Sequence, residues 1–199
     1  MLFERCKDMM PIEFEAKFFV DFGEIKEKIR KMGGVCVRGR GFMRRFVFGI
    51  PGQADQWIRV RDEGDYIALS LKSFHANAEH AIESVRELEV KVSDFGTMVQ
   101  ILELLGYTKS LYMENYREIW KLKDCLVMFD DLPGIEPFIE IEGPSKVSVE
   151  TVASLLGLDM NRAMYGSSWQ FYRDKYGITK EQFNGLKELT FARHPGLLK

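Results

Sequence analysis

The segment IEFEAKFFV, residues 12–20, decides the fold because charged and apolar side chains alternate along it. Successive side chains of a β-strand point to opposite faces, so Glu13, Glu15 and Lys17 share one face of a predicted strand. Apolar side chains, beginning with Ile12 and Phe14, form the other face. For a single strand, a charged face exposed to water is the ordinary interpretation.

The same alternation recurs in four later segments. Their charged faces are Arg59 with Arg61, Ser70 with Lys72, Glu87 with Glu89 and Lys91, and Glu140 with Glu142. Several of these faces are nearly pure, with acids on some strands and bases on others. If the strands close into a barrel, the charged faces point into a wet lumen, and amphipathic helices cover the apolar faces outside.

The remaining patterns predict an α+β protein dominated by one antiparallel sheet. Strands are predicted at 12–20, 43–48, 56–62, 65–72, 86–92, 110–122, 125–131 and 137–142, with a tight hairpin turn at Glu63-Gly64. Helices are predicted at 21–32, from Ser93 or Asp94 to Leu105, around 149–156 and over 161–175, with a capping box at Thr179 and Gln182. A polar loop is predicted at 74–84.

The composition is that of one soluble cytoplasmic domain. The 199 residues carry 28 basic and 30 acidic side chains, a net charge of -2, which favours neither nucleic acid nor an anionic membrane as partner. No apolar run reaches the roughly 18 residues of a spanning helix, and the start MLFERCKDMM lacks the apolar core of a signal peptide. Three cysteines without a CxxC pair argue against disulfides and zinc, and Cys125 is predicted to be buried.

A lumen with this many charges is costly unless a ligand neutralises them. Clustered bases favour a polyanion, and clustered carboxylates favour hard cations such as Mg²⁺ or Mn²⁺. A metal–polyphosphate complex satisfies both. His75, His80 and His194 are predicted surface residues, and Trp57, Trp120 and Trp169 are predicted core residues, with a tunnel mouth as the alternative for Trp120.

Further motifs in a fixed order make the pattern more specific. They are Glu13-x-Glu15-x-Lys17, Arg59-x-Arg61, Lys72, Arg117-Glu118-x-Trp120, Asp130 and Phe138-x-Glu140-x-Glu142-Gly143. This set resembles the CYTH family, named for class IV adenylyl cyclase and thiamine triphosphatase and also called triphosphate tunnel metalloenzymes. The resemblance implies an eight-stranded antiparallel β-barrel, the triphosphate tunnel, with helices packed outside. It places a tunnel domain at 12–176, an N-terminal tail at 1–11 and a C-terminal extension at 177–199.

The resemblance also implies roles for the charged residues. Metal ligands for Mg²⁺ or Mn²⁺ are expected at Glu13, Glu15, Asp130, Glu140 and Glu142, and catalytic roles at Glu13, Glu15 and Lys17. Triphosphate ligands are expected at Lys17, Arg59, Arg61, Lys72 and Arg117, and we add Arg45, although the alternation leaves open which of Arg44 and Arg45 points inward.

Two departures bear on the reaction. Cyclases of this family carry K-x-R where this chain has Asn115-Tyr116-Arg117, and a frequent G-L-G is here Gly134-Ile135-Glu136. We therefore expect hydrolysis of a small-molecule triphosphate: inorganic triphosphate, thiamine triphosphate or a nucleotide. The alternatives are a class IV-type adenylyl cyclase and a non-catalytic polyphosphate or nucleotide binding module. The sequence leaves the oligomeric state open, with a homodimer as one option.

Overall fold

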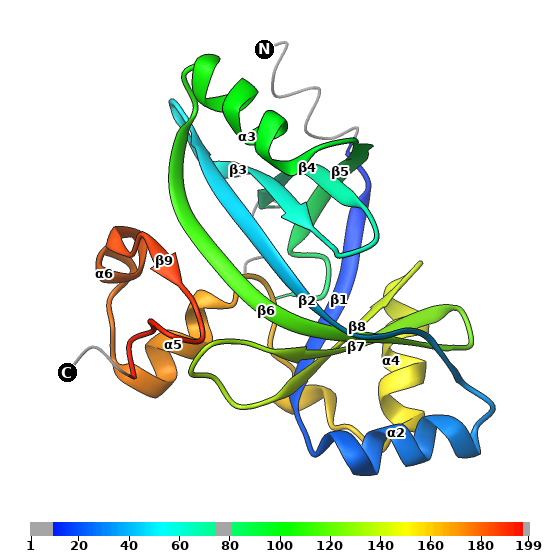
Figure 1. Ribbon diagram of the computed structural model, residues 1–199. Coiled ribbons are helices and arrows are strands. Elements are labelled where there is room, and N and C mark those ends of the chain that lie inside the picture. Colours follow the sequence, from blue (N-terminus) through cyan, green and yellow to red (C-terminus); the bar gives the residue numbers. More distant parts are fainter. Residues whose placement is uncertain (1–9, 75–80, 197–199) are drawn as a thin grey trace.

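A computed structural model describes residues 10–74 and 81–196 (Figure 1). The strands are β1 (Ile12–Phe19), β2 (Val35–Ile50), β3 (Gln53–Asp62), β4 (Ile67–Phe74), β5 (Val85–Val92), β6 (Thr108–Leu122), β7 (Cys125–Asp131), β8 (Phe138–Gly143) and β9 (Glu188–Leu189). The helices are α2 (Phe22–Lys31), α3 (Phe95–Leu104), α4 (Lys146–Leu155), η1 (Met160–Arg162), α5 (Trp169–Tyr176) and α6 (Lys180–Gly185).

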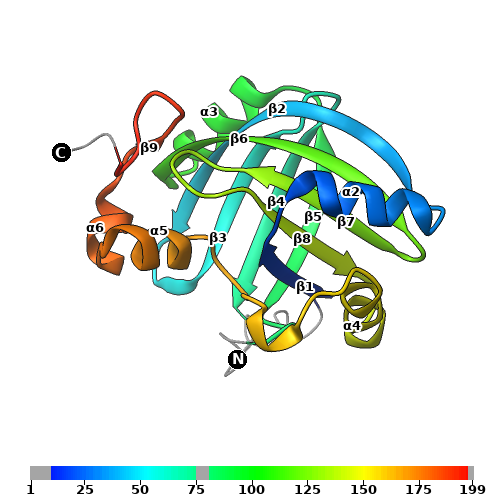
Figure 2. The same ribbon diagram turned by 90° about the horizontal axis from the view of Figure 1, so that it is seen from below.

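The first eight strands form a closed antiparallel barrel. Their order is β2-β3-β4-β5-β1-β8-β7-β6, and pairing of β2 with β6 closes the ring. Figure 2 shows these strands curving around a common interior, with α2 and α4 on one side and α5 and α6 on another. The predicted barrel with external helices is confirmed. The short strand β9 adds to the outside of the ring by parallel pairing with β6.

Local sequence signals fix where the helices begin and end. Asp94, rather than Ser93, caps α3, since its side chain accepts a hydrogen bond from the Thr97 backbone N–H. The predicted capping box of Thr179 and Gln182 is present at α6. The helix predicted over 161–175 is instead split into η1 and α5, because the intervening Met164 pairs with the backbone of Lys17 on β1.

Most of the hydrophobic core lies outside the barrel, as the strand alternation predicts. Outward side chains of β1, such as Ala16 and Phe18, belong to a buried cluster that includes Ile25 of α2 and Val149 of α4. A third cluster lies beneath α3, but the second, beneath α5 and α6, includes Leu111 and Met113, which line the cavity. The cover is incomplete on β5, where Leu88 is 49% exposed.

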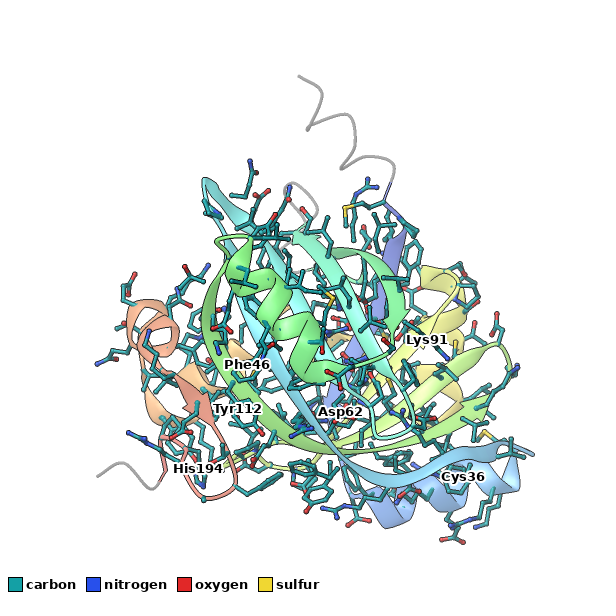
Figure 3. The ribbon with its side chains drawn as sticks, turned by 45° about the horizontal axis from the view of Figure 1, so that its top comes forward. Cys36, Phe46, Asp62, Lys91, Tyr112 and His194 are labelled. Carbon is teal, nitrogen blue, oxygen red and sulfur yellow. The ribbon has the colours of Figure 1, made fainter. Side chains whose placement is uncertain are left out.

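Several single-residue predictions can be compared with the structure. Cys125 is buried as predicted, and Cys36 is exposed near the start of β2 (Figure 3). Trp120 belongs to the core, and Trp169 packs against the second cluster while also lining the internal cavity. Trp57 lines the cavity and belongs to none of these clusters, so its assignment to the core is wrong. His75, His80 and most of the predicted loop at 74–84 lie outside the described residues. Within the residues described, no helix is long and apolar enough to cross a membrane.

Candidate active site

The barrel encloses a cavity of about 720 Å³, a size typical of small-molecule sites. Every residue for which the sequence predicts a site role lines this cavity: Glu13, Glu15, Lys17, Arg45, Arg59, Arg61, Lys72, Arg117, Asp130, Glu140 and Glu142. Strand parity explains the convergence, because these residues occupy the inward positions of β1, β2, β3, β4, β6, β7 and β8.

The barrel register settles which of the two adjacent arginines points inward. Phe46 of β2 lies on the outer face, because its ring packs against Phe95 of the external helix α3 at 5.9 Å and against Tyr112 of β6 at 5.0 Å between centroids (Figure 3). Its neighbour Arg45 therefore points into the lumen, opposite Arg61 of β3. Arg44 points outward, where its Nε lies 3.1 Å from Asp62 and its side chain is 46% exposed.

Carboxylates pair with most of the cavity's cations. Lys17 contacts Glu15 and lies 2.9 Å from Glu140, and Arg117 reaches both Asp130 (2.7 Å) and Glu140 (2.6 Å). On the opposite wall, Arg59 lies 2.8 Å from Glu87, and Lys72 lies 2.8 Å from Glu13 and 3.0 Å from Glu87.

Arg45 differs from the other cations. Among the described residues, no carboxylate forms an ion pair with it. Burial and the like charges of Arg59, Arg61 and Arg117 lower its pKa to about 9. Asp130 opposes this shift but does not outweigh it, so an anionic ligand beside Arg45 would relieve the remaining repulsion.

The acidic wall carries a surplus of negative charge. Burial, followed by the charges of Glu13 and Glu140, raises the pKa of Glu142 to about 7. Burial also raises the pKa of Glu15 well above its usual range, although Lys17 opposes the shift. Burial disfavours ionised Glu140 too, but Lys17 and Arg117 outweigh it and hold its pKa well below the usual range.

The acidic wall fits a hard cation in its chemistry but does not hold a preformed metal site. Its donors are carboxylate oxygens, the ligands that Mg²⁺ and Mn²⁺ prefer, and the raised pKa of Glu142 marks where positive charge is lacking. Among the described residues, however, no three His, Cys, Asp or Glu side chains are arranged to hold a metal ion. Lys17 and Arg117 engage the carboxylates instead, so ion binding requires some of these side chains to turn.

One mouth of the cavity is apolar and aromatic. Trp57 of β3 and Phe74 of β4 line it, with ring centroids 4.9 Å apart. Trp169 of α5 and three residues of α6, Lys180, Phe183 and Asn184, also line the cavity. The predicted C-terminal extension thus contributes to the cavity wall, which the strand pattern alone did not reveal.

Sequence reasoning also missed three cavity acids. Glu87 and Glu89 had the signal, since they share the charged face of β5, but no role was assigned to them. Lys91 continues that face, yet it is exposed, with its Nζ over the Tyr66 ring (Figure 3). Glu63 had no signal, because it falls in the turn after β3.

Asn115 occupies the position where family cyclases carry a cation. It is 1% exposed, and its Nδ2 donates a hydrogen bond to Asp130 Oδ1 at 3.2 Å. The same oxygen accepts a hydrogen bond from Arg117 Nε at 2.8 Å. Asn115 therefore orients Asp130 and adds no positive charge to the cavity.

Known proteins resemble this chain over most of its length. Residues 11–167 match the CYTH domain. A protein of Methanocaldococcus jannaschii named "Putative adenylate cyclase MJ0240" is 27% identical over 135 residues, 66% of this chain and 76% of that one. The PH1012 protein of Pyrococcus horikoshii superposes with a TM-score of 0.69 and 23% identity, over 80% of this chain and 99% of that one. A Vibrio parahaemolyticus structure named as a putative adenylate cyclase gives a TM-score of 0.70 and 13% identity, over 82% and 98% of the two chains. The match to the family domain covers most of the barrel and its charged strands, and the chain belongs to the CYTH family.

Proposed function

We propose that this protein is a divalent-metal-dependent enzyme that binds a triphosphate-containing substrate in the barrel and hydrolyses a phosphoanhydride bond. The observation that carries the proposal is the convergence of six basic side chains and a carboxylate wall on one cavity: Lys17, Arg45, Arg59, Arg61, Lys72 and Arg117 face Glu13, Glu15, Asp130, Glu140 and Glu142. Bases alone are typical of an anion-binding module, and the facing carboxylates favour metal-assisted chemistry.

The basic side chains would hold the phosphate chain. Guanidinium groups bind phosphate through paired N–H donors, which orients the anion as well as attracting it. Arg45 is the natural first anchor, since no described carboxylate competes for it. Arg59 and Lys72 must instead exchange part of their contact with Glu87 for contact with the ligand.

Glu13, Glu15, Asp130, Glu140 and Glu142 are the residues that would hold Mg²⁺ or Mn²⁺. When bound, such an ion would neutralise charge on the phosphate oxygens. Lys17 would also neutralise charge on the phosphate oxygens. Glu140 and Glu15 outweigh the effect of burial and raise the pKa of Lys17, so its ammonium group stays charged.

In the proposed reaction, water adds to the terminal phosphorus and the bridging anhydride oxygen leaves, so inorganic triphosphate yields orthophosphate and diphosphate. The water must lose a proton. A carboxylate of the acidic wall that does not hold the ion would accept it. We infer that Glu13, Glu15 and Lys17 carry the catalytic roles. Glu13 belongs to the same acidic wall as Glu142, since its negative charge raises the pKa of the Glu142 carboxyl.

The alternative reaction is cyclisation of ATP, and it has support in the name of the M. jannaschii relative. Cyclisation must also bend the ribose 3′-hydroxyl onto the α-phosphorus, and small misplacements there cost large factors in rate. Asn115 is neutral where family cyclases carry a cation, so the cavity binds the phosphates less tightly. We infer that this favours attack by water over attack by the ribose 3′-hydroxyl.

The test is incubation of the protein with inorganic triphosphate and, separately, with ATP, each with Mg²⁺ and with Mn²⁺. We expect metal-dependent phosphate release from a triphosphate, lost in EDTA. Cyclic AMP with diphosphate as the main products, without turnover of inorganic triphosphate, would establish the cyclase instead. Tight binding of a triphosphate without turnover of any kind would establish a binding module.

A further inference from the structure

Glu63 occupies a turn but its side chain is inside the barrel. The residue follows the last position of β3, and its carboxyl is 2% exposed and lines the cavity. Its N–H donates to the Tyr66 carbonyl at 2.9 Å, and Gly64 takes the positive φ of 95° that this tight connection requires. The fixed turn therefore directs Glu63 inward, while the preceding Asp62 pairs with Arg44 outside.

The Glu63 carboxylate links two arginines on different strands. Oε1 contacts Nε of Arg61, whose side chain lines the cavity. Oε2 accepts a hydrogen bond at 2.7 Å from Nη2 of Arg38, which comes from β2 and also reaches Asp65 at 3.2 Å. Because the Glu63 carboxylate lies against Nε of Arg61 as an ion pair rather than against its terminal nitrogens, those two nitrogens are left for other acceptors.

Arg61 needs such a partner. Burial and the like charge of Arg59 lower its pKa, and Arg117 acts in the same direction. Without Glu63, repulsion from these cations would favour rotamers in which Arg61 moves away from the lumen. In Glu63 itself, burial opposes ionisation, but Arg61 and the hydrogen bond from Arg38 lower the carboxyl pKa, so the pair stays charged.

We propose that Glu63 is a positioning residue that fixes the Arg61 guanidinium against the triphosphate, with Arg38 holding Glu63 from the outer side. The inference rests on the proposed function of the cavity and adds a residue that contacts no substrate itself. The role of Glu63 differs from that of Glu87, whose carboxylate pairs with both Arg59 and Lys72 inside the cavity.

The sign of the effect on binding separates positioning from simple charge. If Glu63 were only a negative charge near the site, its removal would make the cavity more positive and tighten anion binding. If Glu63 positions Arg61, its removal weakens binding despite the gain in positive potential. Outer partners of ligating groups typically contribute factors of about 10 to 100, so we expect a loss of about tenfold.

The experiment is calorimetric titration of the full chain with inorganic triphosphate in EDTA, where hydrolysis does not interfere. We expect Glu63→Gln to bind about tenfold more weakly, and to add no further loss in an Arg61→Gln background. Asp62→Asn is the matched control, because it removes an acid–arginine pair one residue away on the outer face, and its affinity should equal that of the wild type. Affinity in Glu63→Gln that is unchanged or tighter, or an equal loss without Arg61, would overturn the inference.

Two further measurements keep the outcome decisive. Glu63→Asp retains the charge but shortens the reach, so positioning predicts weaker binding and a charge effect predicts wild-type affinity; this variant decides the case if Glu63→Gln does not fold. If the wild type binds triphosphate neither in EDTA nor with Mn²⁺, the proposed function fails, and crystal structures of wild type and Glu63→Gln decide this inference separately. Arg61 displaced from the lumen supports positioning, and an unmoved Arg61 overturns it.

Discussion

Replacement of Arg45 by glutamine should stabilise the ligand-free protein and weaken its binding of triphosphate. Arg45 lies inside the barrel with Arg59, Arg61 and Arg117 as its charged neighbours, and its pKa falls to about 9. At neutral pH the side chain is charged in both folded and unfolded chains, so the folded state bears the full cost of the buried charge.

The size of the effect follows from the pKa. The difference between 12.5 and about 9 corresponds to at most about 5 kcal/mol. Water in the cavity screens the charge, and an effective dielectric constant of about 20 reduces the expected gain to about 2 kcal/mol. For a domain of this length, a gain of that size raises Tm by about 5 °C.

The same substitution removes the anchor for the ligand. A hydrogen bond to a charged group contributes about 1.5–3 kcal/mol, so loss of Arg45 should weaken triphosphate binding about 10- to 100-fold. Arg44→Gln is the matched control, because Arg44 is exposed on the outer face and its pair with Asp62 contributes at most about 1 kcal/mol. It should shift Tm only slightly and leave binding unchanged.

Thermal unfolding at pH 7.5 without metal and calorimetric titration with inorganic triphosphate measure the two effects. The reasoning is refuted if Arg45→Gln loses stability at neutral pH, or if it binds triphosphate as tightly as the Arg44→Gln control does.

Three further predictions concern other charged and reactive groups. Glu142→Gln should abolish a loss of stability that the metal-free wild type shows as pH rises from about 4.5 to about 7, since the raised pKa of Glu142 favours the protonated folded state; urea unfolding across this range measures it. Glu13→Ala should abolish metal-dependent phosphate release and the Mn²⁺-induced rise in Tm without lowering the metal-free Tm, and a collapsed fold would contradict this. In the native protein a thiol reagent should modify exposed Cys36 and spare Cys125, whose pKa burial raises to about 12; peptide mass mapping tests this, and early labelling of Cys125 would contradict it.

The alternation of side chains was sufficient to assign the charged residues to common faces, whereas the closed eight-stranded barrel followed from the resemblance to the CYTH family. Parity along a strand is a local property, so Arg59 and Arg61 could be assigned to one face without knowing their neighbours. Register is not local. Arg44 and Arg45 are adjacent and therefore occupy opposite faces, and only the pairing of Arg45 with Arg61 shows which one enters the lumen.

Features set by turns and by distant segments were beyond the sequence pattern. Glu63 follows its strand by one residue, and its burial depends on the backbone contact to Tyr66 and on Arg38 from another strand. Trp57 obeys strand parity but was assigned to the core by its residue type. Trp169 and α6 reach the cavity only through the packing of the C-terminal segment against the barrel, which no periodicity encodes.

The most direct test of the central proposal is a crystal structure of the protein with inorganic triphosphate and Mn²⁺, using a non-hydrolysable triphosphate analogue if turnover is too fast. We expect the phosphate chain inside the barrel, with its oxygens against Arg45, Arg59 and Arg61, and Mn²⁺ between the phosphates and the wall of Glu140 and Glu142. Triphosphate bound only on the outer surface, or a lumen that stays empty at saturating ligand, would contradict the proposal.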